Sequence, residues 1–177
     1  PKGDGGCWYW RGMFELIPLP MSWPVYVSQE MAAAYAKWRG CRLPTEAEFQ
    51  RTAYGTPDGS ERAHPWGDET PSPKHGVFDF RSWDPEPAGS HPAGRSAWGV
   101  DDLVGKGWEW TSTVFGPFPG FRPMPSYPEY SADFFDGEHI VMKGASPATA
   151  REFIRPTFRN WFRPTYPYVY ATFRCVR

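Results

Sequence analysis

The segment FIRPTFRNWFRPTYPYVYATFRCV, from Phe153 to Val176, is rich in both cationic and aromatic side chains. It contains four arginines, three tyrosines, three prolines and a tryptophan. Guanidinium groups stack on aromatic rings and bind carboxylates through paired hydrogen bonds, while proline favours extended or turn backbone over helix. The segment therefore predicts one of two structures. It is either the wall of a pocket for a small anionic or zwitterionic ligand, or an arginine–aromatic ladder that cross-links a loop-rich fold.

Length and composition predict one domain that spans residues 1–177. The chain has 19 basic and 20 acidic side chains and a net charge of −1, so nothing in its charge points to nucleic acid or an anionic membrane as a partner. No apolar run approaches the ~20 residues of a membrane-spanning helix. With 21 prolines, 18 glycines and 32 aromatic residues, we expect much irregular backbone held by aromatic packing. Three cysteines without a paired spacing favour a reducing, cytoplasmic location.

Two segments carry the start and stop signals of helices. The first begins after Ser28, a typical N-cap residue, and ends at Gly40. The second begins after Thr45, whose partner Glu48 completes a capping box, and it stops at Gly55. In the first helix a stripe of apolar residues recurs at helical spacing, which predicts that this face packs in the core: Met31, Ala34, Tyr35 and Trp38.

The rest of the chain predicts short strands and long loops. Residues 24–27, 138–143 and 169–176 have the composition of strands, the last two as parts of a small antiparallel sheet. Residues 55–107 are rich in proline, glycine, aspartate and serine, which is typical of a long ordered loop region. The predicted fold class is therefore α+β, with two helices, small antiparallel sheets and long ordered loops.

Common catalytic and metal-binding motifs are missing from the sequence. The four histidines are scattered and form no metal-ligand spacing, and there is no phosphate-binding loop, nucleophile elbow or dinucleotide fingerprint. Cys175, in a predicted strand, is most simply a small core residue. Glu109 is more informative because it stands between Trp108 and Trp110. A carboxylate buried there requires a cation, a metal or several N–H groups as partners.

Six ordered blocks resemble the formylglycine-generating-enzyme/sulfatase-modifying-factor domain family. They are RLPTEAEF (42–49), PWG (65–67), GKGWEWT (105–111), KGASP (143–147), RPTFRNWF (155–162) and TFRCV (172–176). The resemblance implies a C-type-lectin-like fold of the formylglycine-generating-enzyme type, often with bound calcium. Members that generate formylglycine bind copper through a cysteine pair, but residues 148–172 of this chain contain no cysteine. The resemblance therefore does not extend to that oxidation chemistry.

Within this family, FRNWFRPTYPYVYATFRC and FGPFPGF followed by YPEYSADFFDG are similar to the C-terminal domain of ergothioneine-pathway sulfoxide synthases and their selenoneine-forming relatives. The resemblance implies that these 177 residues are part of a longer chain with an N-terminal DinB-like helical bundle. Three histidines of that bundle would hold Fe(II), and O₂ would drive C–S or C–Se bond formation on trimethylhistidine. The implied partners are trimethylhistidine, a thiol or selenium donor and the protein's own N-terminal domain. The 177 residues alone are expected to be inactive.

The resemblance also implies roles for particular residues. No catalytic residue and no metal ligand is assigned within the chain. A structural role is implied for the arginines of the ladder and for the tryptophan-flanked carboxylate with its neighbouring lysine: Arg155, Arg159, Arg174, Glu109 and Lys106. Contacts with substrate are implied for the following residues: Asn160, Trp161, Phe162, Arg163, Tyr166, Phe118, Phe121 and Arg122.

Three positions depart from the best-known members. Lys106 replaces the usual asparagine, and we hypothesise that its ammonium group takes the place of calcium beside Glu109. Phe162 replaces an acidic residue that contacts the thiol substrate in mycobacterial-type enzymes, which favours cysteine or a selenosugar over γ-glutamylcysteine. Phe118 falls near a proposed proton-donor tyrosine. The alternatives are a selenoneine-type synthase, a non-catalytic lectin-like binding module such as the retroelement-diversified receptors, and a scaffold that has lost catalysis.

Overall fold

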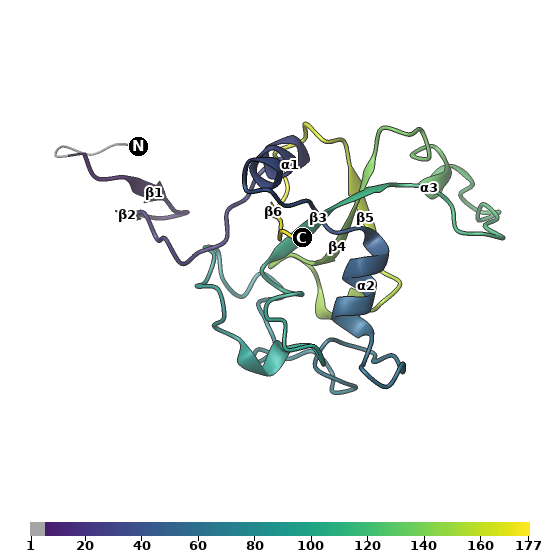
Figure 1. Ribbon diagram of the computed structural model, residues 1–177, viewed down its shortest axis with the longest axis horizontal. Helices are drawn as coiled ribbons and strands as arrows, with labels where there is room; N and C mark the ends of the chain where they lie inside the picture. The colour runs from purple at the N-terminus through teal and green to yellow at the C-terminus, as the bar shows by residue number, and fades with distance from the viewer. Residues whose placement is uncertain (1–5) are drawn as a thin grey trace.

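The computed structural model describes residues 6–177 and shows an α+β architecture with little regular structure (Figure 1). A hairpin of β1 (Tyr9–Arg11) and β2 (Leu16–Pro18) projects from the main body. The body contains a four-stranded sheet in the order β5-β4-β3-β6, with α1 and α2 packed against it. Its strands are β3 (Gly107–Val114), β4 (Ile140–Ala145), β5 (Asn160–Phe162) and β6 (Ala171–Thr172). The predicted fold class is confirmed.

β3 lies between β4 and β6 in the sheet and contains the tryptophan-flanked carboxylate. Its residues Gly107 to Thr111 are all buried. β3 pairs with β4 in antiparallel fashion, so that Glu109 lies opposite Lys143. On its other side it pairs with β6 in parallel, with Glu109 opposite Thr172. The parallel pair differs from the antiparallel sheet that we expected, and only Ala171–Thr172 of the predicted strand 169–176 is regular.

Both predicted helices are confirmed. α1 (Gln29–Trp38) begins after Ser28, whose Oγ accepts a hydrogen bond of 3.3 Å from the Met31 amide. α2 (Glu46–Tyr54) begins after Thr45 with a complete capping box. The strand predicted at 24–27 is wrong, although Val27 donates a backbone hydrogen bond of 2.9 Å to Ala171. A third helix, α3 (Glu129–Ala132), is a single irregular turn.

The prediction that the large apolar stripe of α1 lies in the core is wrong. Ala32 and Ala36 are the fully buried residues of this helix, whereas the exposed fractions of Met31, Tyr35 and Trp38 are 61%, 47% and 74%. The two alanines belong to the same buried cluster as Trp110 and Ala171 of the sheet. Small side chains let the helix approach the sheet closely, so the long side chains remain outside it.

Residues 55–106 form the predicted long loop region, with a single 3₁₀ turn at Pro92–Gly94. Aromatic stacking holds this region together: Trp66 lies parallel to the rings of His64 and His75, with ring centroids 5.0 Å and 4.2 Å apart. Close packing also requires a glycine, because a Cβ on Gly94 would lie 2.1 Å from the His75 carbonyl oxygen. Across residues 6–177, no helix has the length and apolar character needed to cross a membrane.

Candidate functional site

The short strand β5 divides the residues that we expected to form one pocket. Side chains alternate between the two faces of a strand, so Trp161 points away from Phe162. Trp161 stacks on Phe115, with ring centroids 4.2 Å apart. Phe162 instead packs against the core cluster below α1 and stacks on Tyr166 at 4.7 Å. The predicted pocket therefore consists of two separate surfaces.

Trp161 faces a cavity of about 340 Å³ between β5 and the loop 115–135. Of the residues predicted to contact substrate, only Trp161, Phe118 and Phe121 line it. The sequence prediction missed the other lining residues: Phe115, Pro117, Tyr130, Ser131, Phe135, Thr157 and Phe158, together with Arg155 and Arg159, which were expected in a structural role. The signal for several of them was present in the two aromatic runs, FGPFPGF and YPEYSADFFDG.

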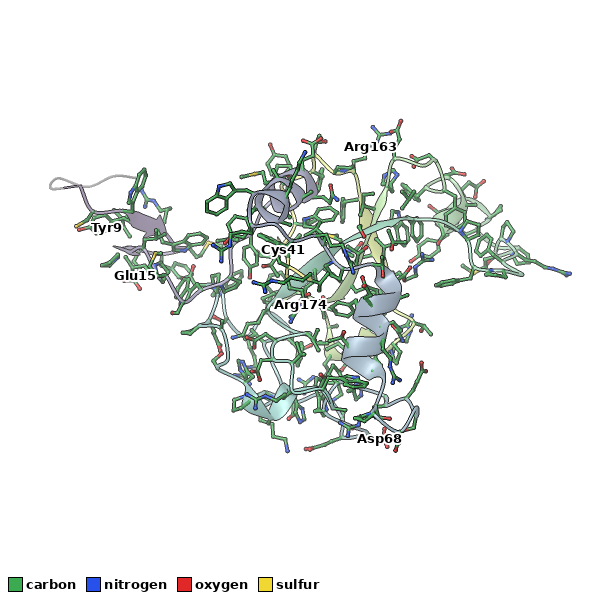
Figure 2. All side chains as sticks on the ribbon, in the orientation of Figure 1. Tyr9, Glu15, Cys41, Asp68, Arg163 and Arg174 are labelled. Atoms are coloured by element: carbon green, nitrogen blue, oxygen red, sulfur yellow. The ribbon has the colours of Figure 1, made fainter. Side chains whose placement is uncertain are left out.

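The remaining predicted contact residues lie elsewhere. Asn160 accepts a hydrogen bond of 2.9 Å from the adjacent Trp161 amide through its own Oδ1. Arg163 lies at the surface, where it pairs with Glu138 at 3.1 Å (Figure 2). Arg122 is exposed. These three side chains do not line the cavity.

Arg159 links the cavity to α2. Its guanidinium lies 4.7 Å from the ring centroid of Phe115 and 4.3 Å from that of Phe118. The same group contacts the Glu46 carboxylate, with Nε 2.8 Å from Oε1, and donates a hydrogen bond of 3.0 Å to the Gly116 carbonyl. Arg155 lies over the Phe158 ring at 5.3 Å. The cavity thus combines aromatic faces with two guanidinium groups.

A second cavity, of about 470 Å³, shares Phe118, Thr157 and Arg159 with the first. Its buried cation is Lys143, whose Nζ donates hydrogen bonds of 2.8 Å and 3.0 Å to the carbonyls of Pro156 and Phe158. Burial lowers the pKa of Lys143 to about 8. The two cavities together place one carboxylate, from Glu46, among several cationic groups.

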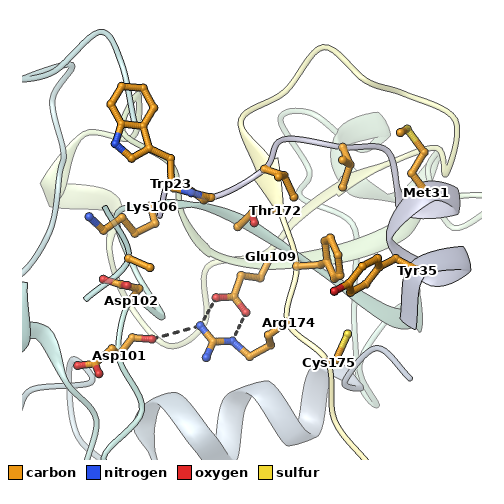
Figure 3. A pocket seen from close by; sticks show the side chains of 15 residues that line it. Trp23, Met31, Tyr35, Asp101, Asp102, Lys106, Glu109, Thr172, Arg174 and Cys175 are labelled. Carbon is orange, nitrogen blue, oxygen red and sulfur yellow. Dashed lines mark hydrogen bonds and ion pairs between the residues drawn. The ribbon is translucent and has the colours of Figure 1, made fainter. Parts of the chain in front are cut away.

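Arg174 is the cation that meets Glu109. Its Nε donates a 2.5 Å hydrogen bond to Glu109 Oε2, and its second nitrogen contacts Oε1 (Figure 3). Our hypothesis that Lys106 neutralises Glu109 is therefore wrong. Lys106 points away from Glu109 and donates to Pro87 O at 2.9 Å and to Ser90 Oγ.

Residues 6–177 contain no group of three or more histidine, cysteine, aspartate or glutamate side chains that could hold a metal ion. The side chains in this part of the chain therefore do not fit an Fe(II) centre. The Lys106 ammonium lies among oxygen atoms of Pro87, Ser90 and, at 4.0 Å, Glu86.

Comparison with known proteins gives a consistent assignment. Residues 15–177 match the model of the sulfatase-modifying factor enzyme 1-like domain. The chain is 41% identical over 158 residues to hercynine oxygenase of Mycobacterium tuberculosis, which covers 88% of this chain and 37% of that protein. It is 34% identical over 175 residues to ergothioneine biosynthesis protein 1 of Schizosaccharomyces pombe, covering 97% of this chain and 21% of the relative. The chain thus spans well under half the length of these two relatives.

Among solved structures, PvdO from Pseudomonas aeruginosa shares the fold, with a TM-score of 0.64 at 20% identity over 90% of this chain and 62% of PvdO. The sequence blocks, the loop-rich α+β architecture and the matched family model all agree. The chain belongs to the sulfatase-modifying factor enzyme 1-like (formylglycine-generating-enzyme) domain family, in the part of it that includes ergothioneine-pathway proteins.

Proposed function

We propose that this chain is the C-terminal domain of a cytoplasmic, O₂-dependent non-haem iron sulfoxide synthase of the ergothioneine type. The full-length enzyme would join sulfur to the imidazole ring of trimethylhistidine. The observation that carries the proposal is the 41% identity to hercynine oxygenase over nearly the whole chain. The aromatic and cationic cavity next to Trp161 supports it, because this is a region that the resemblance associates with substrate.

The lining of the cavity suits a zwitterion with a quaternary ammonium group. The faces of aromatic rings attract such cations, and Phe121, Tyr130 and Trp161 supply three of them. A guanidinium binds a carboxylate. Of the two arginines that line the cavity, Arg155 is the one available for this contact, because the Arg159 guanidinium is already paired with Glu46. In this proposal the domain binds and orients trimethylhistidine and keeps water away from it, which favours reaction by proximity.

The opposite face of β5 would meet the sulfur or selenium donor. Phe162 and Tyr166 stack at 4.7 Å and present no charge to a ligand. The surface offers no charged partner for the additional γ-glutamyl group, so we propose the smaller thiol cysteine as the preferred donor, with a selenosugar as the alternative donor. Introducing a carboxylate by Phe162→Asp should shift the preference toward γ-glutamylcysteine.

Iron would be held by residues outside 1–177, in the N-terminal domain that the resemblance implies. When bound, it would supply the activation of O₂. The described residues offer no ligand set for it, so their contribution is limited to binding, orientation and exclusion of water.

The test is product analysis by mass spectrometry of the full-length protein with Fe(II), O₂, trimethylhistidine and each candidate donor. We expect a sulfoxide product with cysteine and a loss of at least tenfold in kcat/KM for Trp161→Ala. Trp83→Ala should cause little change, because Trp83 lines neither of the two cavities near Trp161. Consumption of no donor by the iron-loaded protein would refute the proposal. Turnover by the 177 residues alone would refute the division of labour between the domains.

A further inference from the structure

The second cavity, of about 470 Å³, lies between α2, β4 and the segment that precedes β5 (Figure 1). Its walls are mostly apolar, with Ala47, Phe118 and Pro156 among the lining residues. Pockets of about 300–1,000 Å³ with apolar walls and a few polar groups are typical of small-molecule sites. The proposed reaction uses the cavity beside Trp161 and assigns no role to this one.

The lining of this cavity carries an excess of one positive charge. Its ionic residues are the cations Lys143 and Arg159 and the carboxylate of Glu46. Arg159 binds both oxygens of Glu46, with Nε 2.8 Å from Oε1 and Nη2 2.9 Å from Oε2. In the sheet Lys143 lies opposite Glu109, but that carboxylate is already paired with Arg174. Lys143 is therefore left without an ion-pair partner within residues 6–177.

The Lys143 ammonium also has an unused donor. An ammonium has three N–H groups, and Nζ donates to the carbonyl oxygens of Pro156 and Phe158 at 2.8 Å and 3.0 Å. The third N–H has no hydrogen-bond partner in the part of the chain that the structure describes. Only 2% of Lys143 is exposed, so bulk water is a poor substitute for that partner. A buried ammonium with an unmet donor is costly, and an anion in the cavity would supply the missing acceptor.

The nine-residue helix α2 begins at the same cavity, with Thr45 and Ala47 in the lining. Thr45 Oγ1 accepts a hydrogen bond of 3.2 Å from the Glu48 amide. Thr113 Oγ1 accepts one of 2.9 Å from the Glu46 amide. The Ala47 amide between them makes no hydrogen bond to another atom of residues 6–177. Free amides at a helix N-terminus favour anions, so this feature favours the same ligand charge as the buried ammonium.

We propose that the second cavity binds a small monocarboxylate with an apolar tail, whose carboxylate pairs with Lys143 at the start of α2. A single negative charge matches the excess of one positive charge in the lining, so a carboxylate fits this site better than a phosphate dianion. The tail would lie against the apolar side chains of Ala47, Phe118 and Pro156. The inference does not depend on the proposed reaction, because it rests only on the residues of this lining.

The test is the binding of butyrate to the full-length protein at pH 7, measured by saturation-transfer difference NMR. Butyramide has nearly the same size without the charge, and we expect it to bind at least tenfold more weakly than butyrate. Lys143→Met should weaken the binding of butyrate at least tenfold. Ala47→Leu, which fills the cavity from an exposed position on α2, should weaken it as strongly. Ala34→Leu, at an exposed position of α1 outside the cavity, is the matched control and should leave the affinity unchanged.

The pH dependence of binding separates Lys143 from Arg159. Burial lowers the pKa of Lys143 to about 8, so its protonated fraction falls from about nine tenths at pH 7 to about one tenth at pH 9. The charged groups that face it are Glu46 and Arg159, and glutamate and arginine side chains do not ordinarily titrate in this range. The affinity of the unmodified protein for butyrate should therefore fall about tenfold from pH 7 to pH 9, whereas that of Lys143→Met should not change.

Equal affinities for butyrate and butyramide would overturn the proposal, and so would an affinity of the unmodified protein that is the same at pH 7 and pH 9. Displacement of butyrate by an equal concentration of chloride would overturn it too, because the site would then accept any simple anion. Displacement by trimethylhistidine or cysteine would overturn it by making the cavity part of the substrate pocket. Product formation is measured separately on the same preparations. Its absence would count against the proposed function and would leave the butyrate result unaffected.

Discussion

Replacing Arg174 with methionine should destabilise the protein by about 3–5 kcal/mol. The substitution keeps most of the apolar length of the side chain but removes the only cation that contacts Glu109 among residues 6–177. Only 3% of the Glu109 side chain is exposed, so water cannot replace the lost partner. A buried charge that loses its partner costs about 3–5 kcal/mol. Domains are stable by about 5–15 kcal/mol in total, so the loss would be a large share of the whole.

The same reasoning predicts that removing both charges is far less harmful. Arg174→Met combined with Glu109→Gln leaves no buried ion, and neutral replacements of buried pairs are often close to neutral in stability. We expect the double variant to recover at least 2 kcal/mol of the loss. Arg163→Met is the control for a surface pair, since the side chains of Arg163 and Glu138 are 62% and 63% exposed. Its expected cost is below about 1 kcal/mol.

Urea titrations followed by tryptophan fluorescence give the free energy of unfolding for each variant. A cost below 1 kcal/mol for Arg174→Met would refute the reasoning, because it would mean that Glu109 finds another partner or becomes protonated without penalty. A double variant as unstable as the single one would refute it differently. The cost would then come from packing of the long side chain rather than from the unpaired charge.

Three further predictions concern stability. Burial lowers the pKa of Lys143 from 10.5 to about 8, so the unfolded state holds more protons than the folded state between these pH values. The free energy of unfolding of the unmodified protein, relative to that of Lys143→Met, should therefore rise by up to about 3 kcal/mol from pH 8 to 10.5. Parallel pH profiles of the two proteins would contradict this. Gly94→Ala should cost about 3 kcal/mol in urea titrations, since its Cβ would lie 2.1 Å from the His75 carbonyl, whereas Gly116→Ala, with nothing within 4 Å, should change stability by less than about 0.5 kcal/mol. Thr45→Ala should lower the thermal midpoint by removing about 1 kcal/mol of capping, and an unchanged midpoint would argue against that capping box.

Local signals predicted the helices well. The capping residues Ser28 and Thr45 lie at the observed starts, because a cap depends only on neighbours three residues away. The buried face of α1 could not be predicted in this way. Its apolar stripe is genuine, but the sheet accepts only Ala32 and Ala36. Which face packs depends on the space left by distant strands, and that information is not local.

The site was predictable in its chemistry and not in its geometry. A carboxylate between two tryptophans indicated a cation, but its partner Arg174 lies 65 residues further along the chain. The aromatic run around Trp161 indicated a pocket wall, yet Phe162 and Tyr166 lie on the opposite face of β5 from Trp161. The missing partners of Trp161 are Phe115, which follows β3, and Tyr130, in the irregular turn α3, so only the folded chain shows that they meet Trp161.

The alternation within β5 makes its pairing register a determinant of ligand choice. Register is held by Val141 opposite Trp161 and Ile140 opposite Phe162. A shift of one residue would exchange the faces, placing Phe162 in the aromatic cavity and Trp161 under α1. A single insertion or deletion in the turn before Asn160 could therefore change which side chains each surface presents to a ligand, without substituting any contact residue. Comparisons between members of this family should align that turn by structure before they compare residues.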